Sequence, residues 1–192
     1  MRSQRGVSLI IALIMLVGMM VAGISMFRKI SSGAILAGNL TFTSSAITAA
    51  DQGSEAGRAW LMAQSATSLY SVVAPGYFPA SCYITNSDPG DCSANPPPAT
   101  FNPATFDWTN NSVLVTAADD AGNEVRYLIH RLCGITGSLS TVNQSCVFTS
   151  TTSSSSHDDE KHLTTTVTPY YRVTTRVRGP RNTVAYTQLT MF

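Results

Sequence analysis

Hydrophobic residues form one uninterrupted block near the start of the chain, directly behind a short basic segment. The block runs from Val7 to Phe27 and contains no Asp, Glu, Lys or Arg, whereas Arg2 and Arg5 lie just before it. A helix of about 21 residues is about 30 Å long, because each residue adds about 1.5 Å, and this length matches the hydrocarbon core of a bilayer. The pattern therefore predicts a membrane-spanning helix over residues 7–27.

Helix-compatible sequence continues well beyond this block. No proline occurs before Pro75, and Pro75-Gly76 is a strong stop signal, so we expect one helix from Val7 to about Tyr70. Its distal half carries a stripe of mostly small residues at helical spacing, which predicts the face that packs on a sheet. The members of this stripe are Ala49, Gly53, Ala56, Trp60, Ala63, Thr67 and Tyr70.

After Pro75 the pattern becomes rich in turns and then alternates like β-strands. Ser112–Ala118 and Asn123–Leu132 predict a β-hairpin around Asp119-Asp120-Ala121-Gly122. Tyr170–Arg178 and Thr183–Met191 predict a second hairpin.

The segment Thr149–Thr168 lies between the two hairpins and is rich in Ser and Thr, with an acidic island. We expect an exposed loop there, whose ends extend neighbouring strands. A long helix followed by antiparallel strands is an α+β arrangement.

The composition adds a bound on size and on charge. A chain of 192 residues predicts one soluble domain behind an anchor. The formal net charge of +1, with 12% charged residues, argues against a strongly electrostatic partner such as bulk duplex DNA.

All four cysteines lie beyond the predicted anchor, and none forms a Cys-x-x-Cys pair. An even count in an exported domain predicts two disulfides, for which three connectivities exist. We favour the local pairs Cys82–Cys92 and Cys133–Cys146, because each closes a short loop. The first bridge is expected to hold mainly a surface loop, and the second to support the sheet.

Three short clusters of acidic or histidine residues resemble metal sites superficially. Asp119 to Glu124 lacks the ligand spacing of a calcium loop and is better explained as a hairpin turn, and Asp88 and Asp91 fit a turn equally well. The run from His157 to His162 lies in Ser/Thr-rich sequence that offers no rigid support for ligands. We therefore expect neither a metal site nor a cofactor.

The sequence contains no constellation that suggests catalysis. The histidines are His130, His157 and His162, the cysteines are expected to be paired, and neither a Gly-x-Ser-x-Gly elbow nor a phosphate-cradling glycine loop occurs. We expect a protein that is not an enzyme.

Three arginines alternate along one predicted strand face: Arg172, Arg176 and Arg178. The polar side of a half-buried strand explains them better than a basic patch for DNA, because the aromatic residues expected of a single-strand platform are not interleaved with them.

The junction Arg5-Gly6-Val7-Ser8-Leu9-Ile10 resembles the processing signal of type IV pilins and type II secretion pseudopilins. Leu36 to Leu40, Ala46 to Asp51 and the C-terminal strand pair narrow the resemblance to PilX-type minor pilins. The resemblance implies a pilin-like fold, with residues 1–6 as leader, 7–27 as membrane and filament-core helix, 28–74 as distal helix and 75–192 as a β-rich domain outside the inner membrane.

The resemblance also implies processing and partners. A prepilin peptidase would cut between Gly6 and Val7 and methylate the new N-terminus. The cut would remove Arg2 and Arg5, so that 10 of the 12 basic residues would remain against 11 acidic ones. The chain would span the bacterial inner membrane once, with a cytoplasmic N-terminus, and later reach the pilus and cell surface. The implied partners are other minor pilins, the major pilin and a large tip adhesin.

The chain departs from the family pattern at Ile11, where most members carry glutamate. That glutamate is thought to neutralise the N-terminal amine of the subunit ahead, so its loss implies a subunit at the pilus tip that helps to initiate assembly. The alternatives are the tip pseudopilin of type II secretion, or an adhesion module that uses Thr149–Thr168. For position 11 itself, the alternative to tip placement is that Ile11 is one more lipid-facing residue.

Overall fold

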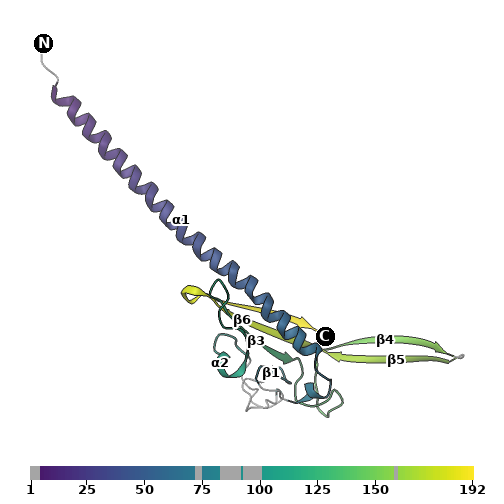
Figure 1. Cartoon of the computed structure of the whole chain (residues 1–192). Helices are drawn as coiled ribbons and strands as arrows, with labels where there is room; N and C mark the ends of the chain where they lie inside the picture. The colour runs from purple at the N-terminus through teal and green to yellow at the C-terminus, as the bar shows by residue number, and fades with distance from the viewer. Residues whose placement is uncertain (1–4, 72–74, 83–91, 93–100, 158–159) are drawn as a thin grey trace. The chain divides into compact units, whose positions relative to one another are not determined.

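The computed structural model describes residues 5–71, 75–82, 92, 101–157 and 160–192, and for residues 5–7, 32, 153–157 and 160–164 it describes the backbone alone. The chain forms two compact units, Met1–Phe42 and Thr43–Phe192. The described part of the first unit is helical throughout, and the second unit holds all the described strands (Figure 1).

The N-terminal helix, α1 (Arg5–Met62), is continuous over 58 residues. It ends before the predicted end near Tyr70, so the predicted extent of the distal helix, residues 28–74, is too long. Local hydrogen bonds explain the early end: Ser68 Oγ donates to the Ser65 carbonyl at 2.7 Å, and the Ser68 amide donates to Ser65 Oγ at 3.4 Å. Such bonds compete with helical ones, and a short 3₁₀ turn, η1 (Ser68–Tyr70), follows instead.

The main sheet has five strands: β1 (Tyr77–Phe78), β2 (Val113–Thr116), β3 (Glu124–Arg131), β6 (Tyr171–Arg178) and β7 (Val184–Met191). Their order is β1-β3-β6-β7, and β2 also pairs with β3. The two predicted hairpins are confirmed, because β2 pairs antiparallel with β3 and β6 pairs antiparallel with β7. A short 3₁₀ turn, η2 (Pro180–Asn182), joins β6 to β7.

One strand contradicts the predicted antiparallel sheet. β1 pairs parallel with β3, with Tyr77 opposite Ile129, so the sheet is mixed. The long connection between β1 and β3 allows the parallel pairing, because it lets the chain return to the same end of the sheet before β3 begins. The α+β layout, with a long helix on a sheet, is confirmed.

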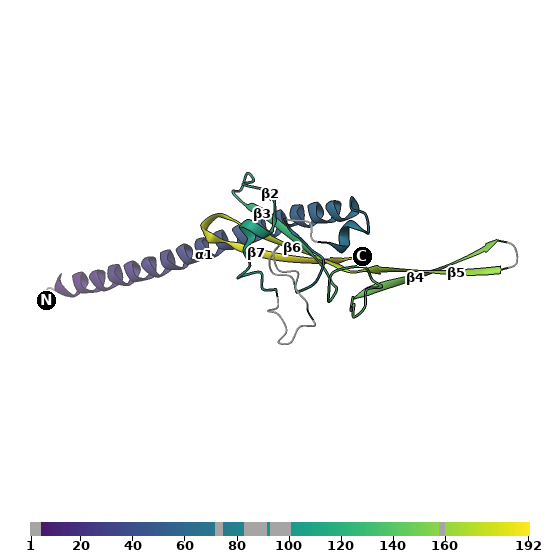
Figure 2. The same cartoon turned by 90° about the horizontal axis from the view of Figure 1, so that it is seen from below.

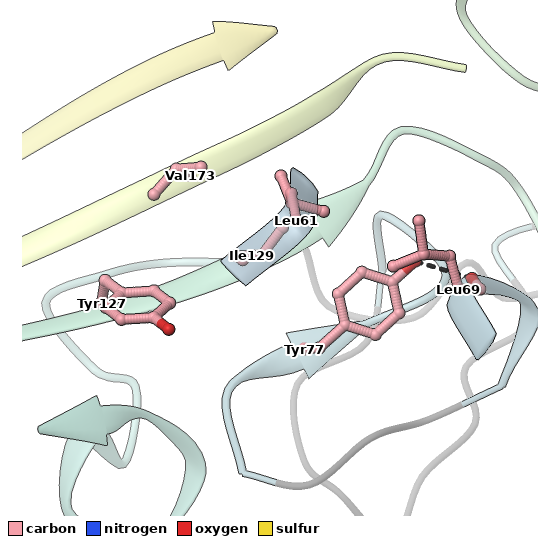
Figure 3. Packing of buried hydrophobic residues seen from close by; sticks show 6 residues of the cluster. All are labelled: Leu61, Leu69, Tyr77, Tyr127, Ile129 and Val173. Carbon is pink, nitrogen blue, oxygen red and sulfur yellow. Dashed lines mark hydrogen bonds between the residues drawn. The ribbon is translucent and has the colours of Figure 1, made fainter. Parts of the chain in front are cut away.

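The helix-facing side of the sheet forms the main core (Figure 3). Its buried members come from the end of α1, from η1 and from three strands: Leu61, Leu69, Tyr77, Tyr127, Ile129 and Val173. Tyr77 is 1% exposed, and its hydroxyl donates to the Leu69 carbonyl at 2.7 Å, so this buried polar group is satisfied. A second cluster on the same side is made of Ala46, Ala49, Ala50, Val125 and Val177.

The predicted stripe of small residues is the helix face that contacts the sheet over most of its length. Gly53 is buried, and Ala56 and Trp60 pack on the main core, whereas Ala63 and Thr67 are exposed beyond the end of the helix. Gly57, one turn beyond Gly53, was not in the predicted stripe and is also buried. A Cβ atom there would lie 2.7 Å from Val173 Cγ1, so the strand approaches the helix more closely than any side chain would permit.

The opposite side of the sheet carries a second, aromatic core that the sequence pattern did not predict. Its buried members are Phe78, Ala80, Cys82, Trp108 and Leu128, with Cys92, Phe101 and Phe106 packed around them. Trp108 begins a single helical turn, α2 (Trp108–Asn111), which Asp107 caps by accepting hydrogen bonds from the Thr109 and Asn110 amides. Over β1 and β3, both sides of the sheet are therefore covered.

The predicted disulfide pairing is confirmed: Cys82 bonds to Cys92, and Cys133 bonds to Cys146. The two bridges are tied together, because the Ser81 amide donates to the Cys133 carbonyl at 2.9 Å and the Cys92 amide donates to the Gly134 carbonyl at 3.0 Å. The sequence suggested that the first bridge holds mainly a surface loop. Cys82 is instead buried in the aromatic core.

The prediction of an exposed loop over Thr149–Thr168 is wrong. This segment forms a long hairpin of β4 (Phe148–His157) and β5 (Glu160–Pro169), which among the described strands pair with each other alone and extend away from the main sheet (Figure 2). Polarity suggested a loop, but β-branched threonine favours strands, and cross-strand threonine pairs such as Thr152 and Thr165 support the ladder.

Candidate functional site

The residues predicted to govern processing and placement lie on the first turns of α1. Gly6 and Val7 are in the opening turn of the helix, and Ile11 follows one turn later. The Ile11 side chain is 52% exposed, so it is not buried in the fold of the described residues. Cleavage after Gly6 and the consequence of Ile11 stay predictions.

The first unit has an apolar surface that the chain itself does not bury. The described helix from Ser8 contains a stretch long and apolar enough to cross a membrane, and none of that stretch is buried. Because this stretch is unburied, its apolar character is not explained by packing in the core of the folded chain, where a helix would be covered by other elements. The exposed apolar side chains include Leu9, Ile10, Ile14, Leu16, Val21, Ile24 and Phe27.

The acidic turn between β2 and β3 is a hairpin turn, as predicted. Asp119 Oδ1 accepts from the Ala121 amide at 2.9 Å and from the Asn123 amide at 2.8 Å, and Oδ2 accepts from Asn123 Nδ2 at 2.8 Å. The hydrogen bonds from Asn123 hold the pKa of the Asp119 carboxyl below its usual range. Asn123 Nδ2 also lies 3.1 Å from Ser45 Oγ, so the turn is tied to the helix.

No group of three or more His, Cys, Asp or Glu side chains that could hold a metal ion is found among the described residues. Asp88 and Asp91 lie outside the described residues. The run from His157 to His162 closes the β4–β5 hairpin, where the backbones of His157 and Glu160 are paired, and its side chains are also outside the description. His130 is fully buried beside the rings of Phe78 and Phe101.

Two of the three arginines of β6, Arg172 and Arg176, contact neighbouring side chains, whereas Arg178 is exposed. Arg176 Nη2 lies 3.0 Å from Glu124 Oε1, and its guanidinium carbon is 5.4 Å from the centre of the Trp108 ring. Arg172 lies over the ring of Phe101, and burial lowers the pKa of its guanidinium. The structure thus supplies aromatic partners from distant segments, which alternation within β6 alone could not reveal.

Arg131 is a structural centre that the sequence did not single out. Its side chain is fully buried, its Nε donates to the Pro79 carbonyl at 2.9 Å, and its Nη2 donates to the Ile135 carbonyl at 3.2 Å. The guanidinium also lies over the Tyr70 ring. Arg131 therefore joins η1, the end of β1 and the disulfide-bonded segment after β3. In the sequence, only its position at the end of a predicted strand pointed to a structural role.

The disulfides border a surface hollow of about 430 Å³. Among the described residues its lining carries no ionisable side chain, because its cysteines are disulfide-bonded. The lining includes Ser81, Cys92, Cys133, Gly134, Ile135 and Cys146.

A second hollow lies at the root of the β4–β5 hairpin and measures about 370 Å³.

Comparison of the chain with models of protein families, with curated proteins and with solved structures finds no match.

Proposed function

We propose that this chain is a non-enzymatic minor pilin of the PilX type, which sits at the pilus tip and helps to initiate assembly. The observation that carries the proposal is α1. Its first half is apolar and unburied, and its second half packs on a sheet through Gly53 and Gly57. One helix would thus serve as membrane anchor, then as filament core, and throughout as support for the exported domain.

The physical basis is the solvent that each half of the helix requires. An apolar helix exposed on all sides is stable in lipid or within a bundle of similar helices, but not in water. The residues from Ser8 to Phe27 meet this description, since the described side chains are exposed over the whole stretch. Extraction from the membrane into a filament of pilin helices would keep them out of water.

The two disulfides support the orientation of the chain. Cys82–Cys92 and Cys133–Cys146 both lie in the second unit, and disulfides persist in oxidising compartments. The second unit is therefore assigned to the outer side of the inner membrane, and the basic residues Arg2 and Arg5 to the cytoplasmic side.

The test is the N-terminus of the protein in cells with an active prepilin peptidase. Mass spectrometry is expected to find a methylated chain that begins at Val7. Gly6→Val should leave the N-terminus uncut, whereas Gly23→Ala, a glycine replacement further along the same helix, should not affect cutting. An intact N-terminus in the unaltered chain would contradict the proposal.

The type II secretion tip pseudopilin is the first alternative. That relative usually carries a large inserted helical domain after its N-terminal helix. In the part of the chain after Pro75 that the structure describes, the α-helix is α2, of four residues. This favours the minor pilin.

The second alternative is an adhesion module. The β4–β5 hairpin favours this alternative, because the hairpin extends away from the sheet (Figure 2). Phe148 and Pro169 are opposite each other in the hairpin, so residues 149–168 can be replaced by a two-residue Asn-Gly turn. Normal piliation with lost adhesion would favour the module. Lost piliation would favour a role in assembly.

A further inference from the structure

The root of the β4–β5 hairpin displays apolar side chains around a hollow. Phe148 is 56% exposed and Val167 is 40% exposed. Ser150 is opposite Val167 in the register, and Phe148 lies two residues before Ser150, so both apolar side chains are on one face of the hairpin. We call the lining of this hollow the hairpin-root surface: Leu139, Ser140, Gln144, Cys146, Phe148 and Val167.

The hollow is large enough to receive side chains from another protein. Its volume is about 370 Å³. An apolar cavity of about 150 Å³ accommodates a benzene molecule, so the hollow can hold an aromatic or branched aliphatic side chain.

The lining of this surface carries no ionisable side chain, since its cysteine is disulfide-bonded, and the charged residues Glu160 and Lys161 of β5 lie at the far end of the hairpin. The sequence contains no Asp, Glu, Lys, Arg or His from Leu132 to Ser156, or from Leu163 to Tyr171. The lining itself therefore offers no cation to the phosphate groups of nucleic acids or of anionic lipids. Charge complementarity selects an uncharged protein segment.

The neighbouring edge of β4 is open to another strand. β4 pairs with β5 alone among the described strands, and the register runs through ten pairs without a bulge. Lysine, proline and bulges protect edge strands from added strands, and β5 contains Lys161 and Pro169. The sequence of β4, Phe148–His157, contains none of these protective features.

A two-stranded hairpin with hydroxyl-rich strands is marginally stable in water. A third strand along β4 would satisfy its outer row of backbone groups and would cover the apolar root. We propose that β4 and the hairpin-root surface bind an uncharged β-strand of a different protein, and that an apolar side chain of this strand enters the hollow.

A second copy of the chain fits less well. If two β4 strands paired antiparallel over their full length, His157 of one copy would stand opposite Phe148 of the other. The apolar side chain that the hollow requires would then be missing. The proposal deepens the function proposed above, because it rests on that function for the class of partner, another component of the pilus.

The test uses the full-length chain in its native membranes, with a photo-crosslinking phenylalanine analogue at position 148. The expected product joins position 148 to one other protein, and mass spectrometry of the linked peptide should locate it in a segment without charged residues. The same analogue at Leu114, an exposed position of β2, is the control and should not give this product. Raised salt should leave the yield unchanged, because no ion pair is involved.

Two matched substitutions separate the hairpin root from another exposed strand position. Val167→Thr should reduce the yield about tenfold, whereas Val184→Thr, the same change at an exposed position of β7, should leave it unchanged. A product linked only to lipid, a product linked to a second copy, or no product would overturn the proposal.

Failure of this proposal is distinguishable from failure of the proposed function. Processing at Val7 without a crosslink at position 148 would contradict only the proposed docking site and would leave the pilin assignment standing. A crosslink in a chain whose N-terminus is intact would support the docking site and contradict the pilin assignment.

Discussion

At the scale of single residues, the contact between helix and sheet depends on side chains that are missing. Gly53 and Gly57 face Thr175 and Val173 of β6, and both strand residues are buried. At Gly57 an added Cβ would lie 2.7 Å from Val173 Cγ1 and 3.2 Å from Tyr127 Cδ2. Since valine is branched and held by the core, it has little room to move.

Gly57→Ala is therefore expected to destabilise the sheet-bearing unit. Alanine improves helix propensity by up to about 1 kcal/mol, but overpacking a core costs about 1–3 kcal/mol, so a net loss of about 1–2 kcal/mol is expected. The measurement is thermal unfolding of the detergent-solubilised chain, with a fall of roughly 2–8 °C. Gly38→Ala is the control, because its Cβ would meet no atom within 4 Å. Equal melting temperatures for both variants would contradict this account.

Asp119 gives a pH dependence at the same scale. Its folded-state pKa is lowered, chiefly by the Asn123 amide and side chain, so its contribution to stability is present above the unfolded-state pKa of about 4. That contribution is lost as the pH falls through the lower folded-state pKa. Asp119→Asn should flatten the acid side of a plot of melting temperature against pH, below about pH 4. An unchanged acid slope would show that the turn does not depend on the ionised carboxylate.

At the scale of elements, the two disulfides support different layers of the fold. Cys133–Cys146 joins the end of β3 to the start of β4, where the Val147 amide also donates to the Leu132 carbonyl at 2.9 Å. Cys82–Cys92 instead holds the aromatic core, with Cys82 in the same cluster as Trp108. The bridges close loops with sequence separations of 10 and 13 residues, and loops of this size are worth roughly 2–3 kcal/mol each.

Replacing both cysteines of a pair by serine should therefore have distinguishable effects. The chain has two tryptophans, so a Trp60→Phe background leaves Trp108 as the only one. Loss of Cys82–Cys92 should expose Trp108 to quencher below the main unfolding transition. Loss of Cys133–Cys146 should instead lower the main transition itself. If Trp108 stayed protected without the first bridge, the aromatic core would be shown to hold unaided.

At the scale of the whole molecule, Ile11 decides where the subunit can sit in a filament, if the proposed function is correct. Burying an unpaired carboxylate in a low-dielectric core costs several kcal/mol, and a subunit at the tip has no subunit ahead to pair with it. Ile11→Glu should restore the pairing group and let the subunit enter the shaft. Immunogold label should then spread along pili, whereas the unaltered protein should be labelled at pilus ends.

The control for this prediction is Ile11→Val, which keeps the position apolar and should keep the label at the ends. Label spread along the shafts of pili that carry the unaltered protein would contradict tip placement. It would also favour the alternative that Ile11 is one more lipid-facing residue.

The sequence by itself determined the features that depend on local pattern. The continuous apolar block predicted a membrane-spanning helix, and the structure shows a helix whose apolar stretch is long enough and unburied. The alternating segments predicted the β2–β3 and β6–β7 hairpins, and short spacing predicted the disulfide pairs. Each of these follows from neighbouring residues, since helical period, strand alternation and loop closure act over short separations.

Only the tertiary structure decided the features that combine distant segments. The parallel pairing of β1, the burial of Arg131 among three segments and the aromatic residues over Arg172 and Arg176 join residues far apart in the chain. The β4–β5 hairpin was missed for a related reason. A Ser/Thr-rich segment has no contrast between apolar and polar positions, so its strands become evident only when each finds its partner across the hairpin.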